Sequence, residues 1–326
     1  MSYRSFLTPS PFVTAGAVLV GMVIGYGVAY FYPVLPECQY EFINPQFACG
    51  SQVEETAGER AELRNHIESY VKEVKASGNA VEVAVYFREL LDGPMFGIND
   101  RIQFIPASLL KLPKVLAVYA LAEQDPRLYE ATLMATRTPD SLVQHFMPTD
   151  HITVGTSYTV AEVAEFSLEY SDNTADWMIN QLLIQSDGGT EILEDTFTTL
   201  GIINPGGDIA LASMSAKQYG SIFRQLYNAS FLNEAQSEAV LTAMVRSPFD
   251  KGLRRGIPGD IAVAHKFGER FLESGERHLH DCGIVYYPGR PYVLCIMTRG
   301  TNFDTLSRII GHISQEVFTE IQSGNR

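Results

Sequence analysis

Three short motifs in this 326-residue sequence combine residue types that can carry out nucleophilic chemistry. They are Ser108-Leu109-Leu110-Lys111, Ser171-Asp172-Asn173 and Lys266-Phe267-Gly268. A serine hydroxyl is a weak nucleophile and requires a nearby base. One helical turn places Lys111 on the same face as Ser108, within side-chain reach. A lysine held there beside a second cation, here Lys266, would have a lowered pKa and could serve as that base.

The context of the motifs matters more than the motifs themselves, because each is common alone. Ser-x-x-Lys recurs at residues 69–72, and Ser-x-Asn recurs at residues 323–325. Ser69 lies inside a highly charged helix, and we interpret its position as part of a solvent-exposed face. Ser108, in contrast, follows Pro106 and begins an apolar helix. If each residue is considered alone, its ordinary interpretation is a surface lysine, a helix-capping serine or a turn asparagine. Their order along the chain favours one shared site.

The spacing of apolar residues predicts the elements that must position these motifs. We expect a helix over residues 51–76, strands over 81–88 and 95–98, a buried helix over 108–122, a mostly helical stretch to about 255, strands over 261–267, 283–287 and 292–298, and a helix over 303–321. Strands from both ends would form one antiparallel sheet, with the helical block inserted between them. A hairpin turn at residues 288–291 would set Cys282 opposite Met297, which predicts that Cys282 and Cys295 are two packed thiols rather than a disulfide.

In this order the three motifs resemble those of the serine β-lactamase and penicillin-binding protein superfamily, and most closely the class A β-lactamases. Ser171 follows Ser108 by 63 positions and Lys266 follows Ser171 by 95, and the second gap is somewhat short for that family. The segments around the motifs also resemble those of the family: residues 252–258 precede the Lys266 strand, and Gly188-Gly189 and Leu200-Gly201 follow the second motif. The similarity covers residues 54–322. It implies an α+β fold: an antiparallel sheet flanked by N- and C-terminal helices, with an inserted all-helical subdomain at about 123–255.

The resemblance also implies a role for each residue of the motifs. Ser108 would be the nucleophile, Lys111 the base, and Ser171 the proton relay to the leaving nitrogen. Lys266 would attract a substrate carboxylate, and the backbone N–H groups of Ser108 and Glu269 would form the oxyanion hole. The substrate-binding residues would be Asn173, Phe267, Gly268 and Glu269. The substrates would be β-lactams or D-alanyl-D-alanine-like peptidoglycan stem peptides.

The sequence departs from the family pattern at two places. Phe267 stands where the family has Thr or Ser, whose hydroxyl helps to hold the substrate carboxylate. The family's water-activating Glu, in an E-x-x-L-N context, has no counterpart between Asn173 and Ser215. Asp208 is the one acid in the loop of residues 202–212 and so its only substitute. Acylation with slow deacylation is therefore expected.

The N-terminal residues 1–33 have the composition of a cytoplasmic tail and a transmembrane anchor. Residues 12–32 are almost purely apolar, and 21 helical residues span about 30 Å, enough to cross a bilayer. Arg4 favours a cytoplasmic N-terminus. A cleaved signal peptide, with Gly27-Val28-Ala29 as its site, and a buried core helix are the alternatives. The stripe Ala17, Gly21, Gly25 and Ala29 would allow two such helices to dimerise.

Residues 34–50 read as a juxtamembrane linker, in which Cys38 and Cys49 could form a disulfide, and residues 51–326 as the hydrolase domain. That domain would lie outside the cytoplasmic membrane, in the bacterial periplasm or on the outer surface. The net charge of −14 argues against a nucleic-acid partner. No metal-binding or nucleotide-binding motif occurs, and a Ser-Lys mechanism implies no cofactor. The alternatives are an inactive wall-binding or scaffolding protein that keeps the fold, and an esterase or amidase with an unrelated substrate.

Overall fold

The computed structural model describes residues 40–45, 60–91, 93–139, 144–202 and 212–324, which lie in one compact unit, Tyr40–Arg326. The predicted transmembrane segment at residues 12–32, its small-residue stripe, the cysteines of the linker and Asp208 all lie outside these ranges. Within the ranges described, no helix combines the length and apolar character needed to cross a membrane. The predicted helix at 51–76 is described from α3, Ala61–Ala76, onward.

A five-stranded antiparallel sheet in the order β2-β1-β7-β6-β5 forms the centre of the fold. Its strands are β1 (Glu82–Glu89), β2 (Met95–Ile98), β5 (Val263–Phe271), β6 (Arg277–Val285) and β7 (Tyr292–Gly300). Strands from the two ends of the chain pair directly, since β1 lies beside β7 along its whole length. The predicted sheet is therefore confirmed, and β5 forms one free edge.

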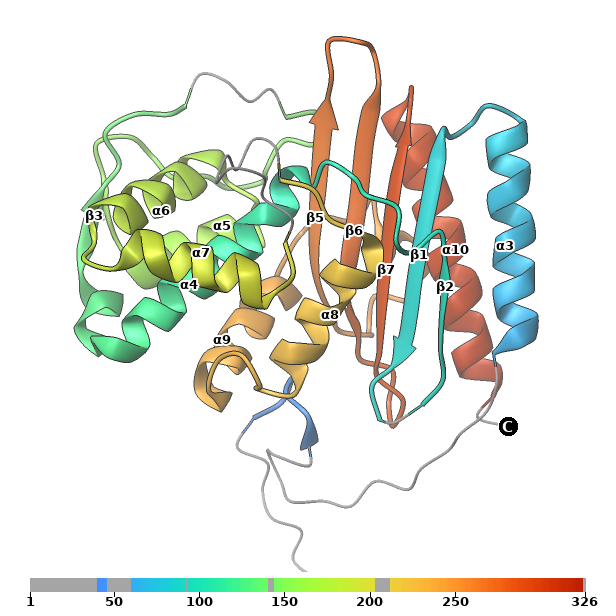
Figure 1. Ribbon diagram of the computed structural model, residues 1–326, viewed down its shortest axis with the longest axis horizontal. Helices are drawn as coiled ribbons and strands as arrows, with labels where there is room; N and C mark the ends of the chain where they lie inside the picture. Colours follow the sequence, from blue (N-terminus) through green and yellow to red (C-terminus); the bar gives the residue numbers. More distant parts are fainter. Residues whose placement is uncertain (1–39, 46–59, 92, 140–143, 203–211, 325–326) are drawn as a thin grey trace, which may run out of the picture. The chain divides into compact units, whose positions relative to one another are not determined.

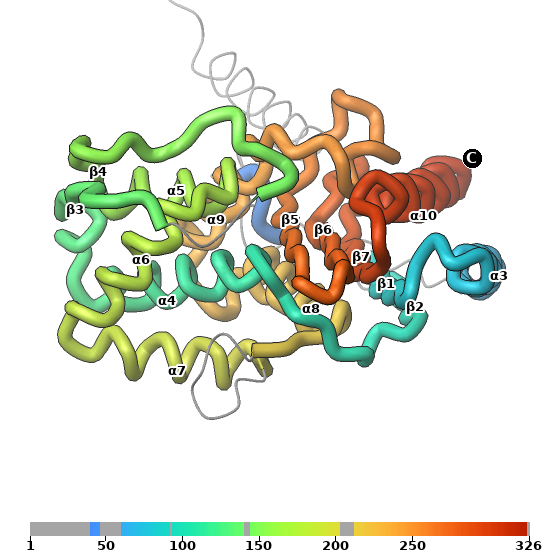
Figure 2. The backbone as a smooth tube through the Cα atoms, turned by 90° about the horizontal axis from the view of Figure 1, so that it is seen from above, coloured from blue at the N-terminus to red at the C-terminus, as the bar shows by residue number. Residues whose placement is uncertain are grey.

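Helices cover both faces of this sheet (Figures 1 and 2). The terminal helices α3 and α10, Phe303–Ser323, pack on one face. The inserted helical block packs on the other face through α8 and comprises α4 (Lys111–Gln124), α5 (Val160–Glu169), α6 (Asn173–Gln185), α7 (Gly189–Thr199), α8 (Ala216–Tyr227) and α9 (Glu234–Val245). Each face of the sheet packs in its own hydrophobic core, and alternate residues of β1 point into the two cores. Val83, Val85 and Phe87 face the terminal helices. Ala84 and Tyr86 face the helical block.

The prediction for Cys282 and Cys295 was wrong, because these residues lie directly opposite each other and form a disulfide. The turn begins earlier than expected. Arg290 N–H donates to the carbonyl of Tyr287 at 2.9 Å, and Gly289 has φ of 73°, which defines a tight turn around Pro288-Gly289. Val285 therefore pairs with Tyr292, and the register differs by two residues from the one expected.

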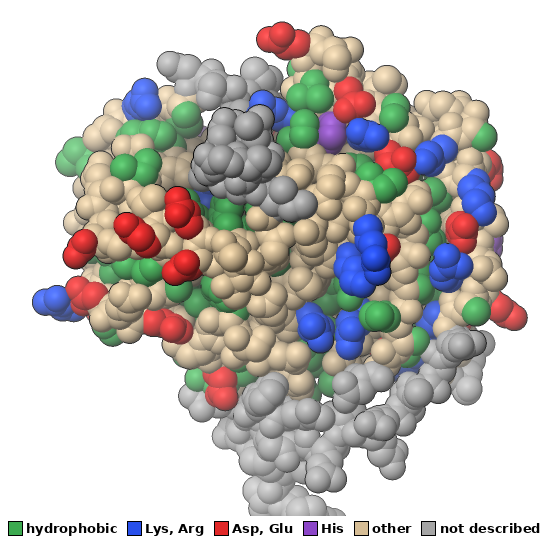
Figure 3. Space-filling model, in the orientation of Figure 1, with side chains coloured by type: hydrophobic (Ala, Val, Ile, Leu, Met, Phe, Trp, Pro, Cys, Tyr) green, Lys and Arg blue, Asp and Glu red, His purple; other side chains and the backbone are tan. Residues whose placement is uncertain are grey.

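Two further details were absent from the sequence-based expectation. Within the helical block, β3 (Thr132–Met134) and β4 (Ser157–Thr159) form a small two-stranded sheet. β6 begins at Arg277, well before the predicted residue 283. On the face seen in Figure 3, acidic side chains gather over the helical block, and Lys and Arg side chains gather over the sheet. The negative net charge is thus unevenly distributed on this face.

Candidate active site

Ser108 lies in a short 3-10 helix, η1 (Ala107–Leu110), that leads directly into α4. Ala107 has φ of 52°, an uncommon conformation for a non-glycine residue and one often found at functional sites. A Cβ added to Gly268 would lie 2.8 Å from the carbonyl oxygen of Pro106. Glycine at 268 therefore lets β5 approach the turn that carries Ser108, a side chain that remains partly exposed.

Lys111 is the first residue of α4 and is only 2% exposed. Its ammonium donates hydrogen bonds to Asn173 Oδ1 at 2.8 Å, to Ser171 Oγ at 3.3 Å and to the Ser171 carbonyl oxygen. Burial lowers the pKa of Lys111 to about 8. Among the described residues no hydrogen bond joins Lys111 to Ser108, so in this state the amine is held by the second motif.

The second motif connects α5 to α6 through a sharply bent backbone. Ser171 has φ of 55° and is fully buried, and its carbonyl oxygen also accepts from Gln144 Nε2 at 3.3 Å. Asp172 caps α6, because its Oδ1 accepts from Ala175 N–H at 2.6 Å. Asn173 is the first residue of α6, and its amide is thereby directed to Lys111.

Lys266 lies in β5 and is 1% exposed. Its ammonium donates to the carbonyl oxygen of Phe267 at 3.0 Å. Burial lowers the pKa of Lys266 well below its usual value, and the positive charge of Lys111 lowers it further. The two amines are thus close enough for their charges to interact, whereas the cation that lowers the pKa of Lys111 in addition to burial is Lys114.

The free edge of β5 presents the backbone N–H of Glu269. Tyr286 N–H donates to the carbonyl oxygen of Ala262, so these two residues form a hydrogen-bonded pair of the β5–β6 ladder. Such pairs alternate along an antiparallel ladder, which directs the backbone groups of Phe267 and Glu269 away from β6. The N–H expected to contribute to an oxyanion hole is thus at an edge of the sheet with which no strand of the described ranges pairs.

The carboxylate of Glu269 makes contacts that the sequence did not indicate. Its Oε1 accepts from the backbone N–H groups of His145 and Phe146, both at 3.0 Å. Its Oε2 is buried and has no hydrogen-bond partner among the described residues. Burial raises the pKa of Glu269. This contact joins the loop before α5 to β5 across the edge of the sheet.

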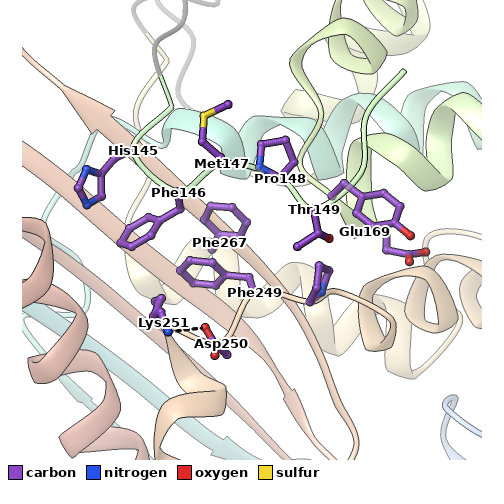
Figure 4. A pocket seen from close by; sticks show the side chains of 12 residues that line it. His145, Phe146, Met147, Pro148, Thr149, Glu169, Phe249, Asp250, Lys251 and Phe267 are labelled. Atoms are coloured by element: carbon purple, nitrogen blue, oxygen red, sulfur yellow. Dashed lines mark ion pairs between the residues drawn. The ribbon is translucent and has the colours of Figure 1, made fainter. Parts of the chain in front are cut away.

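Phe267 points to the opposite face of β5 from Lys266 and is 5% exposed. Its ring stacks on Phe249 with centroids 3.8 Å apart and planes 12° apart. Both rings line a cavity of about 340 Å³, and Figure 4 shows them close to Phe146. The Phe267 ring thus packs in the core on the side of the terminal helices and also forms part of the lining of this cavity.

Two further polar pairs near the motifs were missed in the sequence. Lys114 Nζ is 3.0 Å from both carboxylate oxygens of Asp176 and joins α4 to α6 one turn beyond the Lys111 contact. His280 Nε2 donates to the carbonyl of Ile105 at 2.9 Å, just before η1, and burial lowers the pKa of His280 to about 3. The i, i+3 spacing of Lys111 and Lys114 was a usable signal, whereas nothing local marked His280. Over the described ranges no cluster of side chains is suited to hold a metal ion.

Comparisons with known proteins show a family match and similar folds. A family model described as the β-lactamase enzyme family matches residues 63–321. A structure of PBP-A, a mutant solved as an acyl-enzyme complex with penicillin G, is 22% identical with a TM-score of 0.67, over 83% of this chain and 100% of that one. A β-lactamase from Chitinophaga pinensis is 20% identical with a TM-score of 0.67, over 79% and 100%. A class A β-lactamase from Mycobacterium abscessus is 21% identical with a TM-score of 0.64, over 78% and 99%.

Proposed function

Because the chain belongs to the β-lactamase enzyme family, we propose that it is a serine hydrolase that forms an acyl-enzyme through Ser108. Its proposed substrates are β-lactams or D-alanyl-D-alanine-like peptidoglycan peptides. The observation that carries this proposal is the buried Lys111 amine, which lies one turn from Ser108 and is hydrogen-bonded to Ser171 and Asn173. Its pKa of about 8 leaves a useful neutral fraction near pH 7.

In the proposed acylation, neutral Lys111 accepts the proton of Ser108 as Oγ attacks the substrate carbonyl carbon. The backbone N–H groups of Ser108 and Glu269 stabilise the negative oxygen of the tetrahedral intermediate. The carbon–nitrogen bond then breaks, and the proton held by Lys111 passes through Ser171 to the leaving nitrogen. Lys111 is within 3.3 Å of Ser171 Oγ, close enough for this transfer. Asn173 would hydrogen-bond the substrate amide.

We propose that deacylation is slow. Hydrolysis of the ester requires a base that activates water, and the family's Glu has no counterpart in the sequence between Asn173 and Ser215. The acid that could substitute, Asp208, lies outside the described residues. A protein of this kind would accumulate the acyl-enzyme in the manner of a penicillin-binding protein.

We further propose that residues 12–32 anchor the enzyme in the cytoplasmic membrane, with the hydrolase domain on its outer side. The apolar character of this segment and the single preceding charge, Arg4, support the placement. The stripe Ala17, Gly21, Gly25 and Ala29 would permit a dimer through the anchor.

Time-resolved intact-mass analysis with penicillin G tests the central proposal. We expect one covalent adduct, located on Ser108 after digestion, that decays slowly. The Ser108→Ala variant is the control and should form none. The absence of any adduct on the wild-type protein would favour the alternative, a non-catalytic wall-binding or scaffolding protein, for which the hydroxyl-free Phe267 is the supporting observation.

A further inference from the structure

A buried ion pair lies one helical turn beyond the proposed base and has no role in the mechanism above. Lys114 Nζ is 3.0 Å from both carboxylate oxygens of Asp176, and the two side chains are only 7% and 16% exposed. Lys114 follows Lys111 by three residues on α4, and Asp176 follows Asn173 by three residues on α6. These helices lie side by side (Figure 2) and are therefore joined by two successive polar contacts.

The part of α4 that carries the pair is otherwise apolar. The residues next to Lys114 are buried, and they are Leu112, Pro113, Val115 and Leu116. Taking two charges out of water costs free energy that their attraction offsets only in part, and an apolar pair of similar volume is often equally stable. The stability of the helical block is therefore a weak explanation for a buried ion pair at this place. The nearest other ionisable side chain on α4 is Lys111.

Lys111 has no carboxylate among its hydrogen-bond acceptors in the described residues. Its ammonium donates to Asn173 Oδ1 and to two oxygens of Ser171, and all three acceptors are uncharged. An ion pair between Lys111 and a carboxylate therefore does not fix the charge of this buried amine. Its charge depends on groups that act over a longer distance.

The charged groups around Lys111 come from three elements. They are Lys114 on α4, Asp172 and Asp176 on α6, and Lys266 and Glu269 on β5. Burial is the main cause of the lowered pKa of Lys111; among the charges, Asp176 opposes burial most strongly, and Lys114 acts in the same direction as burial. Because both charges lie about one turn away in a buried site, each acts on Lys111 strongly, and their opposite signs make the effects of the pair largely cancel.

We propose that Lys114 and Asp176 are positioning residues for acylation, which hold α6 against α4 beside the base and together set the fraction of Lys111 that is neutral. This inference rests on the proposed function, in which Lys111 is the base. Neither residue touches the substrate, and both act through Lys111. Without the carboxylate, the remaining cation of Lys114 would favour the neutral amine. Without the Lys114 cation, the remaining carboxylate would favour the ammonium.

The pH profile of acylation by penicillin G tests the pair, with the full-length protein in detergent micelles. In wild type the midpoint is expected at about pH 8. Asp176→Asn should move the midpoint to lower pH and Lys114→Gln should move it to higher pH. Each shift should be roughly one pH unit, the effect of a single charge about one helical turn away. The double variant lacks both charges and should return to within about half a unit of the wild-type midpoint.

Two further variants distinguish an effect of charge from an effect on packing. Asp176→Glu keeps the charge and should keep the wild-type midpoint. Glu165→Gln is the matched control, because it removes a charge of the same helical block whose ion pair with Arg246 is solvent-exposed, and it should not shift the midpoint. Unchanged midpoints in folded Asp176→Asn and Lys114→Gln proteins, or shifts in the same direction, would overturn the proposal. If Asp176→Asn does not fold, the comparison of Lys114→Gln with the double variant decides.

A direct titration of Lys111 separates this proposal from the proposed function. The ε-carbon signals of ¹³C-labelled lysine are followed by NMR between about pH 6 and about pH 11, and the Lys111 signal is identified by its loss in Lys111→Met. Opposite shifts of its midpoint in the two single variants support the pair whether or not penicillin G reacts. If penicillin G acylates no protein, the proposed function fails and the titration alone decides the pair. If wild type is acylated on Ser108 but the Lys111 midpoint is the same in all variants, the pair has no such role and the serine hydrolase stands.

Discussion

The Lys111 ammonium donates a hydrogen bond to Asn173 Oδ1 at 2.8 Å, and each of these residues is the first of its helix. The contact therefore joins the start of α4 to the start of α6. It also holds the amine of the first motif against the second motif, 62 residues away in the chain. The site depends on this junction between two helices, and its properties can be tested directly.

The neutral form of Lys111 should control the rate of acylation. Because burial lowers its pKa to about 8, the fraction able to accept a proton rises with pH and saturates above that value. The second-order rate constant for penicillin acylation should therefore increase up to about pH 8 and then level off. Lys111→Ala should reduce it by roughly 10²–10⁴-fold. A pH profile that is flat between 6 and 9, measured by stopped-flow at about 25 °C, would contradict this role.

Lys111 should also affect how stability varies with pH. Its pKa is about 8 in the folded state and 10.5 in the reference state, so between these values the unfolded chain binds more protons. The contribution of Lys111 to the free energy of unfolding therefore rises with pH between these two values. The slope is up to about 1.4 kcal/mol per pH unit for one proton. The free energy of unfolding should be measured by chemical denaturation for wild type and Lys111→Met at several pH values. The two proteins should differ in the slope of this free energy against pH only within this range.

Gly268→Ala should disrupt the turn that carries Ser108. The added Cβ would lie 2.8 Å from the Pro106 carbonyl oxygen and 3.0 Å from Leu109 N, so β5 and η1 must separate. We expect destabilisation of about 1–3 kcal/mol and a loss of acylation. Gly259→Ala is the matched control, since nothing lies within 4 Å of its Cβ position. If both variants are acylated at the wild-type rate, acylation does not depend on the close approach of β5 to η1 at Gly268.

The disulfide between Cys282 and Cys295 should contribute to stability without affecting the site. It closes a short loop with a sequence separation of 13, for which chain entropy gives about 3 kcal/mol. The Cys282→Ala/Cys295→Ala protein should unfold at lower denaturant concentration yet acylate at the wild-type rate. Alkylation of the denatured, unreduced protein, followed by peptide mapping, should leave both cysteines unlabelled. Labelling of either cysteine under these conditions would show that the bond does not form.

The anchor is tested by truncation. Deleting residues 1–33 should move the protein from the membrane fraction to the soluble fraction, because the apolar segment at residues 12–32 is removed. Penicillin acylation in solution should be unchanged, since this segment lies outside the site. Recovery in the soluble fraction of a product that lacks the residues before about position 30, from expression of the whole chain, would instead support a cleaved signal peptide.

The sequence by itself determined the family, the order of the elements and the three motifs. These properties are local: Ser108 and Lys111 are related by one helical turn, and strands such as β1 are marked by their own apolar residues. The antiparallel sheet followed from topology, because strands at both ends of the chain had to bury apolar faces together. The exchange at Phe267 and the missing loop Glu were also visible in the chain alone.

Tertiary structure alone decided what the motifs contact. The register of β6 and β7 depended on a turn that began one residue earlier than expected, and the resulting two-residue change of register brought Cys282 opposite Cys295. The direction of Phe267, its stack on Phe249, and the contact of Glu269 with the loop at His145 join segments distant in sequence. Burial of Lys111 and Lys266 sets their pKa values, and burial is a property of the packed molecule rather than of any local pattern.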